Sequence, residues 1–128
     1  MVTNSREYMR NWRLKHPDYN RKYMEKYYSE HPEQCKASRR KSREKYRKKI
    51  RLEILELLGN KCVRCEESDV RCLQVDHING GGGQERKQFT STTQMFKRIV
   101  EKIKAGSKDY QILCANCNWK KKFENGEL

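Results

Sequence analysis

The sequence lacks any long apolar stretch, since only 34% of its 128 residues are hydrophobic and 37% are charged. A transmembrane helix needs about 20 predominantly apolar residues in a row, so a membrane-spanning protein is excluded. The first residues, Met1-Val2-Thr3, are not followed by the apolar core of a secretory signal, and we expect a cytoplasmic protein that is not secreted. So little apolar material predicts a thin core, which a structural metal would supplement.

Acidic residues are scarce beside basic ones, with 17 Asp and Glu against 30 Lys and Arg and a formal net charge of +13. This excess favours a polyanionic partner, most simply nucleic acid. Residues 1–61 carry 18 basic and 8 acidic groups, whereas residues 62–128 carry 12 and 9. We therefore expect a basic, DNA-binding helical arm over residues 1–59 and a more compact module over residues 60–128.

Proline occurs only at Pro17 and Pro32, each time after a histidine. The two His-Pro steps belong to a repeat in which every matched position is shifted by fifteen residues. Proline favours the first turn of a helix, and the residue before it disfavours helix. The pattern predicts helices over residues 5–15, 18–30 and 33–58. We interpret His16 and His31, at the joints, as structural.

The third predicted helix is strongly basic in its first half, with ten Lys or Arg between Lys36 and Arg51 and one acid, Glu44. So unbalanced a run favours contact with a DNA backbone over a solvated surface. The residues expected to bind DNA are Arg39, Arg40, Lys41, Arg43, Lys45, Arg47 and Lys48. Apolar residues at helical spacing follow from Ile50 to Leu58 and predict packing on the second module.

Aromatic residues interleave with the charges of the arm. They are Tyr8, Trp12, Tyr19, Tyr23, Tyr27, Tyr28 and Tyr46. Such side chains can stack on exposed bases or bond to phosphates. Their helical spacing, shared by Met9 and Met24, favours the alternative that they pack helix against helix.

Four of the six cysteines form two Cys-x-x-Cys pairs. The pairs are Cys62-Val-Arg-Cys65 and Cys114-Ala-Asn-Cys117. Two such pairs suit one tetrahedral Zn²⁺, and a disulfide framework is the alternative, better suited to secreted chains. We interpret Cys35 and Cys72 as ordinary thiols, because the isolated spacing of Cys72 argues against a role as a substitute zinc ligand.

Asp76 and His77 lie between the two pairs, and Asn118 directly follows the second pair. With this order the chain resembles the HNH, or ββα-metal, nuclease family from Cys62 to about Phe123, roughly half its length. The resembling text is Cys62-Val-Arg-Cys65, Leu73-Gln74-Val75-Asp76-His77-Ile78-Asn79-Gly80 and Gln111-Ile112-Leu113-Cys114-Ala115-Asn116-Cys117-Asn118-Trp119-Lys120. The resemblance implies an α+β, mostly helical fold in which a zinc-stapled ββα-metal module follows the basic arm. If the chain is encoded by a phage, we expect it in the host cytoplasm or nucleoid.

The resemblance implies a DNA endonuclease in which His77 is the general base and Asp76 and Asn118 hold a catalytic Mg²⁺ or Mn²⁺. Histidine can take a proton near neutral pH, and carboxylate and amide oxygens are hard ligands suited to these ions. The resemblance leaves Cys62, Cys65, Cys114 and Cys117 to a structural Zn²⁺. One site per chain predicts that a monomer nicks one strand. A double-strand cut needs two chains, as in a homodimer, or two successive cleavage events.

Asp76 and His77 are neighbours, so on an extended strand they would point to opposite faces. We therefore expect a bend or bulge that re-aims one of them, followed by a turn at Gly80–Gly83. Arg86 or Lys87 is expected to contact a phosphate near the site.

A final helix that opens near Ala115 is expected to carry Asn118 inward and the residues from Trp119 to Lys122 outward. Lys120 and Lys121 would then meet the DNA backbone, with ordinary helix C-terminal charge as the alternative.

The remaining elements are two short strands, over residues 73–77 and 110–113, and one helix over residues 94–105. Thr92 or Thr93 is the expected cap of that helix. Many members of the family have Asn five residues before the second pair, where this chain has Asp109. Asp can accept the same backbone hydrogen bonds but cannot donate one.

Two other functions stay open at this point. A zinc-stabilised module with a basic arm would bind nucleic acid without catalysis, although such a module has no need of Asp76, His77 and Asn118 beside the metal. An RNA-directed nuclease or processing factor is the third possibility, because phosphate contacts do not distinguish DNA from RNA.

Overall fold

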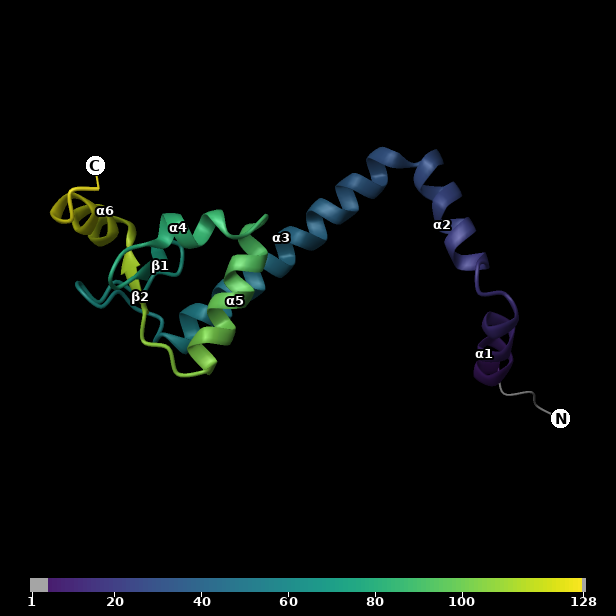
Figure 1. Cartoon of the computed structure of the whole chain (residues 1–128), viewed down its shortest axis with the longest axis horizontal. Coiled ribbons are helices and arrows are strands. Elements are labelled where there is room, and N and C mark those ends of the chain that lie inside the picture. The colour runs from purple at the N-terminus through teal and green to yellow at the C-terminus, as the bar shows by residue number, and fades with distance from the viewer. Residues whose placement is uncertain (1–4, 128) are drawn as a thin grey trace. The chain divides into compact units, whose positions relative to one another are not determined.

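The computed structural model describes residues 5–127 and is a mostly helical α+β fold with two strands, as the sequence predicts (Figure 1). The elements are α1 (Ser5–Lys15), α2 (Tyr19–Glu30), α3 (Pro32–Leu57), β1 (Leu73–His77), α4 (Gly82–Lys87), α5 (Thr92–Lys104), β2 (Tyr110–Cys114) and α6 (Ala115–Glu124). The chain divides into two compact units, Met1–Lys41 and Ser42–Leu128. Within the described residues, no helix combines the length and apolar character that crossing a membrane requires.

The first unit consists of helices linked by two joints of the same construction. At the first joint the backbone N–H of His16 donates to the carbonyl of Trp12 (3.0 Å), and at the second that of His31 donates to Tyr27 (2.9 Å). The imidazole rings lie against the same residues, with ring centroids 4.5 Å apart for Trp12 and His16 and 4.7 Å for Tyr27 and His31. The fifteen-residue repeat is thus a repeat of structure, and the histidines lie at the predicted joints.

The aromatic residues of α1 and α2 are not buried, since neither helix has a buried residue. Tyr8 is 63% exposed and Tyr23 58%. Some contacts are local, such as the edge-on packing of Trp12 on Tyr19 across the first joint (4.8 Å). The interpretation of these residues as packing helix against helix is therefore wrong except near the joints, and their faces are open to a partner.

The second unit is built on a regular antiparallel pair of strands, β1 and β2. The register runs from Leu73 opposite Cys114 to His77 opposite Tyr110. Because side chains alternate along a strand, His77 and Tyr110 share one face of the pair, and Asp76 shares the other with its partner Gln111.

Helices pack on both faces of the strand pair, with α6 on the face of Asp76 and the end of α3 on the other. The end of α3 and the inner side of α5 pack with Tyr110 in one cluster, through Ile50, Ile54 and Ile99. A second cluster joins Leu55 of α3 to the strands and to the cysteine-bearing segments. The predicted packing of the end of α3 on this module is confirmed, and Figure 1 shows α5 beside that end of α3.

Two local predictions for the segment between the strands are corrected. The cap of α5 is Ser91 and not Thr92 or Thr93, because the Ser91 hydroxyl accepts the N–H of Gln94 (3.3 Å) while its backbone is extended. The glycines do form the expected turn, with positive φ at Gly80 and Gly81, but the chain then winds at once into α4, which the sequence pattern did not predict.

Ile54 tests the contribution of the α3 end to this core. Ile54 is fully buried (0% exposed), whereas Leu52, in the same helix, is 49% exposed. Ile54→Ala should lower the free energy of unfolding by about 2–5 kcal/mol, because it removes apolar contact and leaves a cavity. Urea denaturation followed by circular dichroism would measure the change. Leu52→Ala is the matched control and should cost less than about 0.5 kcal/mol; equal losses in the two variants would contradict the assignment.

Candidate metal and catalytic site

The four paired cysteines converge on one point. One sulfur from each of Cys62, Cys65, Cys114 and Cys117 lies within 4.8 Å of all the others. The sulfurs of Cys65 and Cys114 are 3.6 Å apart. Tetrahedral zinc with Zn–S bonds of about 2.3 Å needs sulfurs about 3.8 Å apart, so the cluster fits a structural Zn²⁺. Cys35 and Cys72 are free thiols outside the cluster.

The electrostatics of the cluster also favour a bound cation. Hydrogen bonding with Cys114, together with burial, raises the pKa of the Cys117 thiol to about 12. Burial would raise the pKa of Cys62 too, but hydrogen bonds with the backbone of Cys114 and Arg64 lower it to about 6. Thiols this close oppose one another's ionisation, and a divalent metal removes that conflict.

Helix α6 begins inside this cluster. Cys114 is its N-cap, and the Cys114 sulfur accepts the N–H of Cys117 (3.4 Å). The positive end of the helix dipole stabilises thiolates placed there. A metal on these four sulfurs would fix the direction in which α6 leaves β2, and with it the positions of Asn118 and Lys121.

On one face of the strand pair, Asp76 is held by two donors. The ammonium of Lys121 lies 2.6 Å from its Oδ2 atom, and the amide of Gln111 donates to the same atom (2.7 Å). Lys121 also donates to the backbone carbonyl of His77. Among the described residues, no hydrogen bond to Oδ1 of Asp76 is present, so one carboxylate oxygen remains open.

Asn118 lies over the same face, one turn before Lys121 in α6. Its Nδ2 group donates to Oε1 of Gln74 (2.6 Å), which leaves the amide oxygen as the free end. Asp76, His77 and Asn118 all line one cavity of about 320 Å³, together with the glycines that follow β1. The three residues singled out by the motif are thus brought to one place.

His77 lies on the other face, against a buried acid from α4. Its Nε2 atom is hydrogen-bonded to Glu85, which also accepts from Lys102 (2.6 Å) and from the Tyr110 hydroxyl (2.9 Å). Burial favours the protonated acid, but the hydrogen bonds from Lys102, His77 and Tyr110 outweigh it and lower the pKa of Glu85 below its usual value. Glu85 is therefore a carboxylate at neutral pH.

The expected bulge between Asp76 and His77 is absent from β1, where the pairing with β2 is continuous. The two side chains leave opposite faces, as an extended strand requires, and neither is re-aimed. The cavity instead wraps around the end of the strand, because the turn at Gly80 and Gly81 brings α4 back beside His77.

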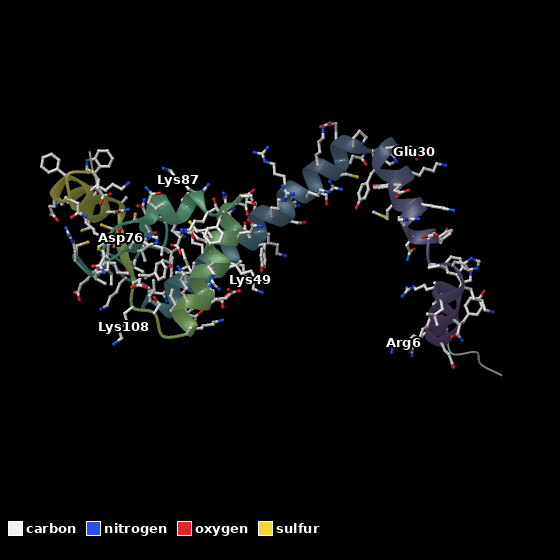
Figure 2. The ribbon with its side chains drawn as sticks, in the orientation of Figure 1. Arg6, Glu30, Lys49, Asp76, Lys87 and Lys108 are labelled. Carbon is white, nitrogen blue, oxygen red and sulfur yellow. The ribbon has the colours of Figure 1, made fainter. Side chains whose placement is uncertain are left out.

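The expectation that Lys121 points outward is also wrong. Lys121 is only 7% exposed and faces Asp76, because α6 packs that side on the strands. Trp119 and Lys122 are exposed, as expected. Arg86, Lys121 and Lys122 line the cavity together with the acids Asp76 and Glu127, so basic groups outnumber acidic ones there. In Figure 2 Asp76 lies among the crowded side chains of this unit, while Lys87 and Lys108 extend away from the ribbon.

Asp109 contributes through its backbone at the end of β1. Its carbonyl accepts the N–H of Ile78 (2.8 Å), and its carboxylate accepts the Ser107 hydroxyl (2.7 Å). The Asp109 side chain thus stabilises a local turn. The hydrogen bond to the segment after His77 is made by the backbone carbonyl, so it does not depend on the residue type at position 109.

Several residues of the site were missed in the sequence. Gln111 and Tyr110 could have been found from strand pairing, since they lie directly opposite Asp76 and His77. Glu85 and Lys102 carry no local signal, because they come from two helices of the segment between the strands and meet only in three dimensions.

Comparisons with protein-family models, curated proteins and solved structures give no match to this chain. What can be said of its function rests on the arrangement of its own residues.

The zinc assignment predicts a metal content that depends on named thiols. We expect about one zinc per chain in the purified protein, measured by inductively coupled plasma mass spectrometry. Cys117→Ser should lose most of this metal, because it removes a buried ligand. Cys72→Ser, an exposed thiol outside the cluster, is the control and should retain it. Loss of zinc in both variants, or in neither, would contradict the assignment of zinc to the four-cysteine cluster.

Proposed function

We propose that this protein is a metal-dependent DNA endonuclease of the HNH type, which hydrolyses one phosphodiester bond per active site. The observation that carries the proposal is the shared cavity. Asp76, His77 and Asn118 come from a strand and from a helix 41 positions further on, and they line the same 320 Å³ space. A module that only binds nucleic acid has no need for this convergence.

The donor set suits a hard divalent cation. The open Oδ1 of Asp76 and the free amide oxygen of Asn118 are oxygen ligands of the kind preferred by Mg²⁺ and Mn²⁺. Lys121 already compensates part of the charge on Asp76, and two protein oxygens leave most of the coordination sphere to water and substrate. When bound, such an ion supplies Lewis acidity toward the phosphate and the leaving oxygen.

The remaining roles belong to side chains around the cavity. His77 would take the proton from the attacking water, because an unprotonated imidazole nitrogen can act as a general base. Arg86, Lys121 and Lys122 would offset the charge of the phosphate that enters. Arg86 is steadied by a hydrogen bond to the Thr92 hydroxyl (2.6 Å), which limits its freedom before substrate arrives.

The basic run of α3 would supply affinity for the DNA backbone. Residues 36–49 are all exposed, so their charges face solvent along more than three turns of helix. Arg51 is different, because its guanidinium donates to the carbonyls of Val70 (2.6 Å) and Leu73 (2.5 Å) and so ties α3 to the start of β1. The expected DNA contacts therefore end before Arg51.

Cleavage of supercoiled plasmid tests the proposed activity. Wild-type protein in Mg²⁺ or Mn²⁺ should convert the plasmid to open circles, and EDTA should prevent this. His77→Ala should reduce the rate by about 10²–10⁴-fold, because the general base is lost, while a gel shift shows that DNA binding is retained. His31→Ala, which changes a histidine of the first unit, is the matched control and should still nick.

The outcomes separate the alternatives. Full activity in His77→Ala would refute the assigned base. A clear gel shift without cleavage in either metal would favour the non-catalytic zinc-stabilised module, and cleavage of RNA alone would favour the RNA-directed nuclease. Linear product formed directly from supercoiled DNA would indicate paired active sites.

The salt dependence of DNA affinity tests the role of α3. Arg43→Gln combined with Arg47→Gln removes two charges one turn apart on the exposed helix. The slope of log affinity against log salt should become shallower by about 1.8, since each phosphate contact contributes about 0.9. Fluorescence anisotropy with a labelled duplex would measure it. Lys97→Gln with Lys108→Gln removes the same charge from positions outside α3, and an equal effect there would contradict a specific role for α3.

A further inference from the structure

The His77 ring separates two different environments. On one side is a cavity of about 290 Å³ whose wall includes Glu85, Lys102 and Tyr110. On the other side is the 320 Å³ cavity of Asp76 and Asn118. His77 lines both, so the chemistry available to it depends on which ring nitrogen faces which cavity.

The Nε2 atom faces the first cavity, where its partner can only accept. Glu85 is 8% exposed and receives hydrogen bonds from Lys102 (2.6 Å) and Tyr110 (2.9 Å) in addition to His77. An ionised carboxylate has no proton to donate, so the shared proton must belong to Nε2. A neutral imidazole carries only one N–H, and Nδ1 is therefore left with its lone pair.

The Nδ1 atom faces Gly82, at the start of α4. A Cβ atom at this position would lie 2.8 Å from Nδ1 and 3.2 Å from Cε1 of His77, closer than side-chain atoms normally approach. Gly82 lines the cavity of Asp76 and Asn118. The absence of a side chain here keeps open the space beside the unprotonated nitrogen, whereas a Cβ at the adjacent Gly83 would meet nothing within 4 Å.

We infer that Glu85 is a positioning residue that holds His77 in the tautomer with Nε2 protonated and Nδ1 open to the cavity of Asp76 and Asn118. The inference rests on the proposed function only in naming Nδ1 as the nitrogen that accepts the proton from water. Lys102 balances the charge of Glu85, so the acid acts mainly by orienting the ring.

Nitrogen NMR of the histidine rings tests this without any activity measurement. The chain contains three histidines, so His16 and His31 serve as internal references in the ¹⁵N-labelled full-length protein. At about two pH units above the ordinary histidine pKa of about 6.5, long-range ¹H–¹⁵N correlations should show His77 with a proton on Nε2 and none on Nδ1. The assignment follows from loss of these signals in His77→Gln. A proton on Nδ1 in the wild type would overturn the inference.

Substitutions of Glu85 and Gly82 test whether these residues determine the His77 tautomer. In the wild type the Nε2 proton should exchange slowly enough to be observed, and Glu85→Ala should remove this signal while the other two rings stay unchanged. Glu101→Ala, an acid of α5 paired with the exposed Arg98, is the control and should leave it intact. Gly82→Ala should shift the Nδ1 resonance and Gly83→Ala should not. Persistence of the Nε2 proton in Glu85→Ala would overturn the inference.

Plasmid nicking by the same samples keeps this inference distinct from the proposed function. Glu85→Gln should lower the nicking rate about 10–100-fold with unchanged DNA affinity and zinc content, because ring orientation and not folding is affected. If His77 has the expected tautomer but the protein does not nick DNA, the proposed nuclease activity is rejected and the role of Glu85 stands. If the protein nicks DNA but the His77 proton lies on Nδ1, the role of Glu85 is rejected and the nuclease activity stands.

Discussion

The four thiols of Cys62, Cys65, Cys114 and Cys117 are the constraint on which the second unit depends. They join two stretches of chain that are about fifty residues apart, at the point where β2 ends and α6 begins. The two hydrophobic clusters around the strands are small, and one of them includes three of these cysteines. A metal at this point would therefore contribute to folding as well as hold α6 in place, since small domains with thin cores depend on such ties.

The position of α6 and the strand register together create the site. Antiparallel pairing puts Asp76 and His77 on opposite faces of β1, where each meets a different helix. Lys121 of α6 reaches Asp76, while Glu85 of α4 reaches His77. Asp76 and His77 thus each have their own charged partner, and the strand end carries both toward one cavity without any distortion of the backbone. This division lets an acid and a base differ in environment although they are neighbours in sequence.

The first unit and the exposed part of α3 are not stabilised by a buried core. They bury nothing in α1 and α2, and their stability as helices comes from local contacts such as the His-Pro joints and the cation–π contact of Arg39 on Tyr28 (4.7 Å). Exposed charges and exposed aromatic rings are available to a partner, and nucleic acid offers both phosphates and base surfaces. The proposed nuclease would thereby separate affinity, carried by the helices, from chemistry, carried by the strand end.

The sequence by itself determined the helices other than α4, the two strands and the four-cysteine cluster, because proline joints, apolar periodicity and Cys-x-x-Cys spacing are local signals. It also singled out Asp76, His77 and Asn118. Only the tertiary structure decided which partners these residues have: Lys121 turns inward and Glu85 and Lys102 meet at His77. The reason is physical, since a salt bridge between residues of separate helices depends on packing and leaves no periodic trace in the chain. The direction of Lys121 was mispredicted for the same reason, because helix charge alone does not reveal which face is covered.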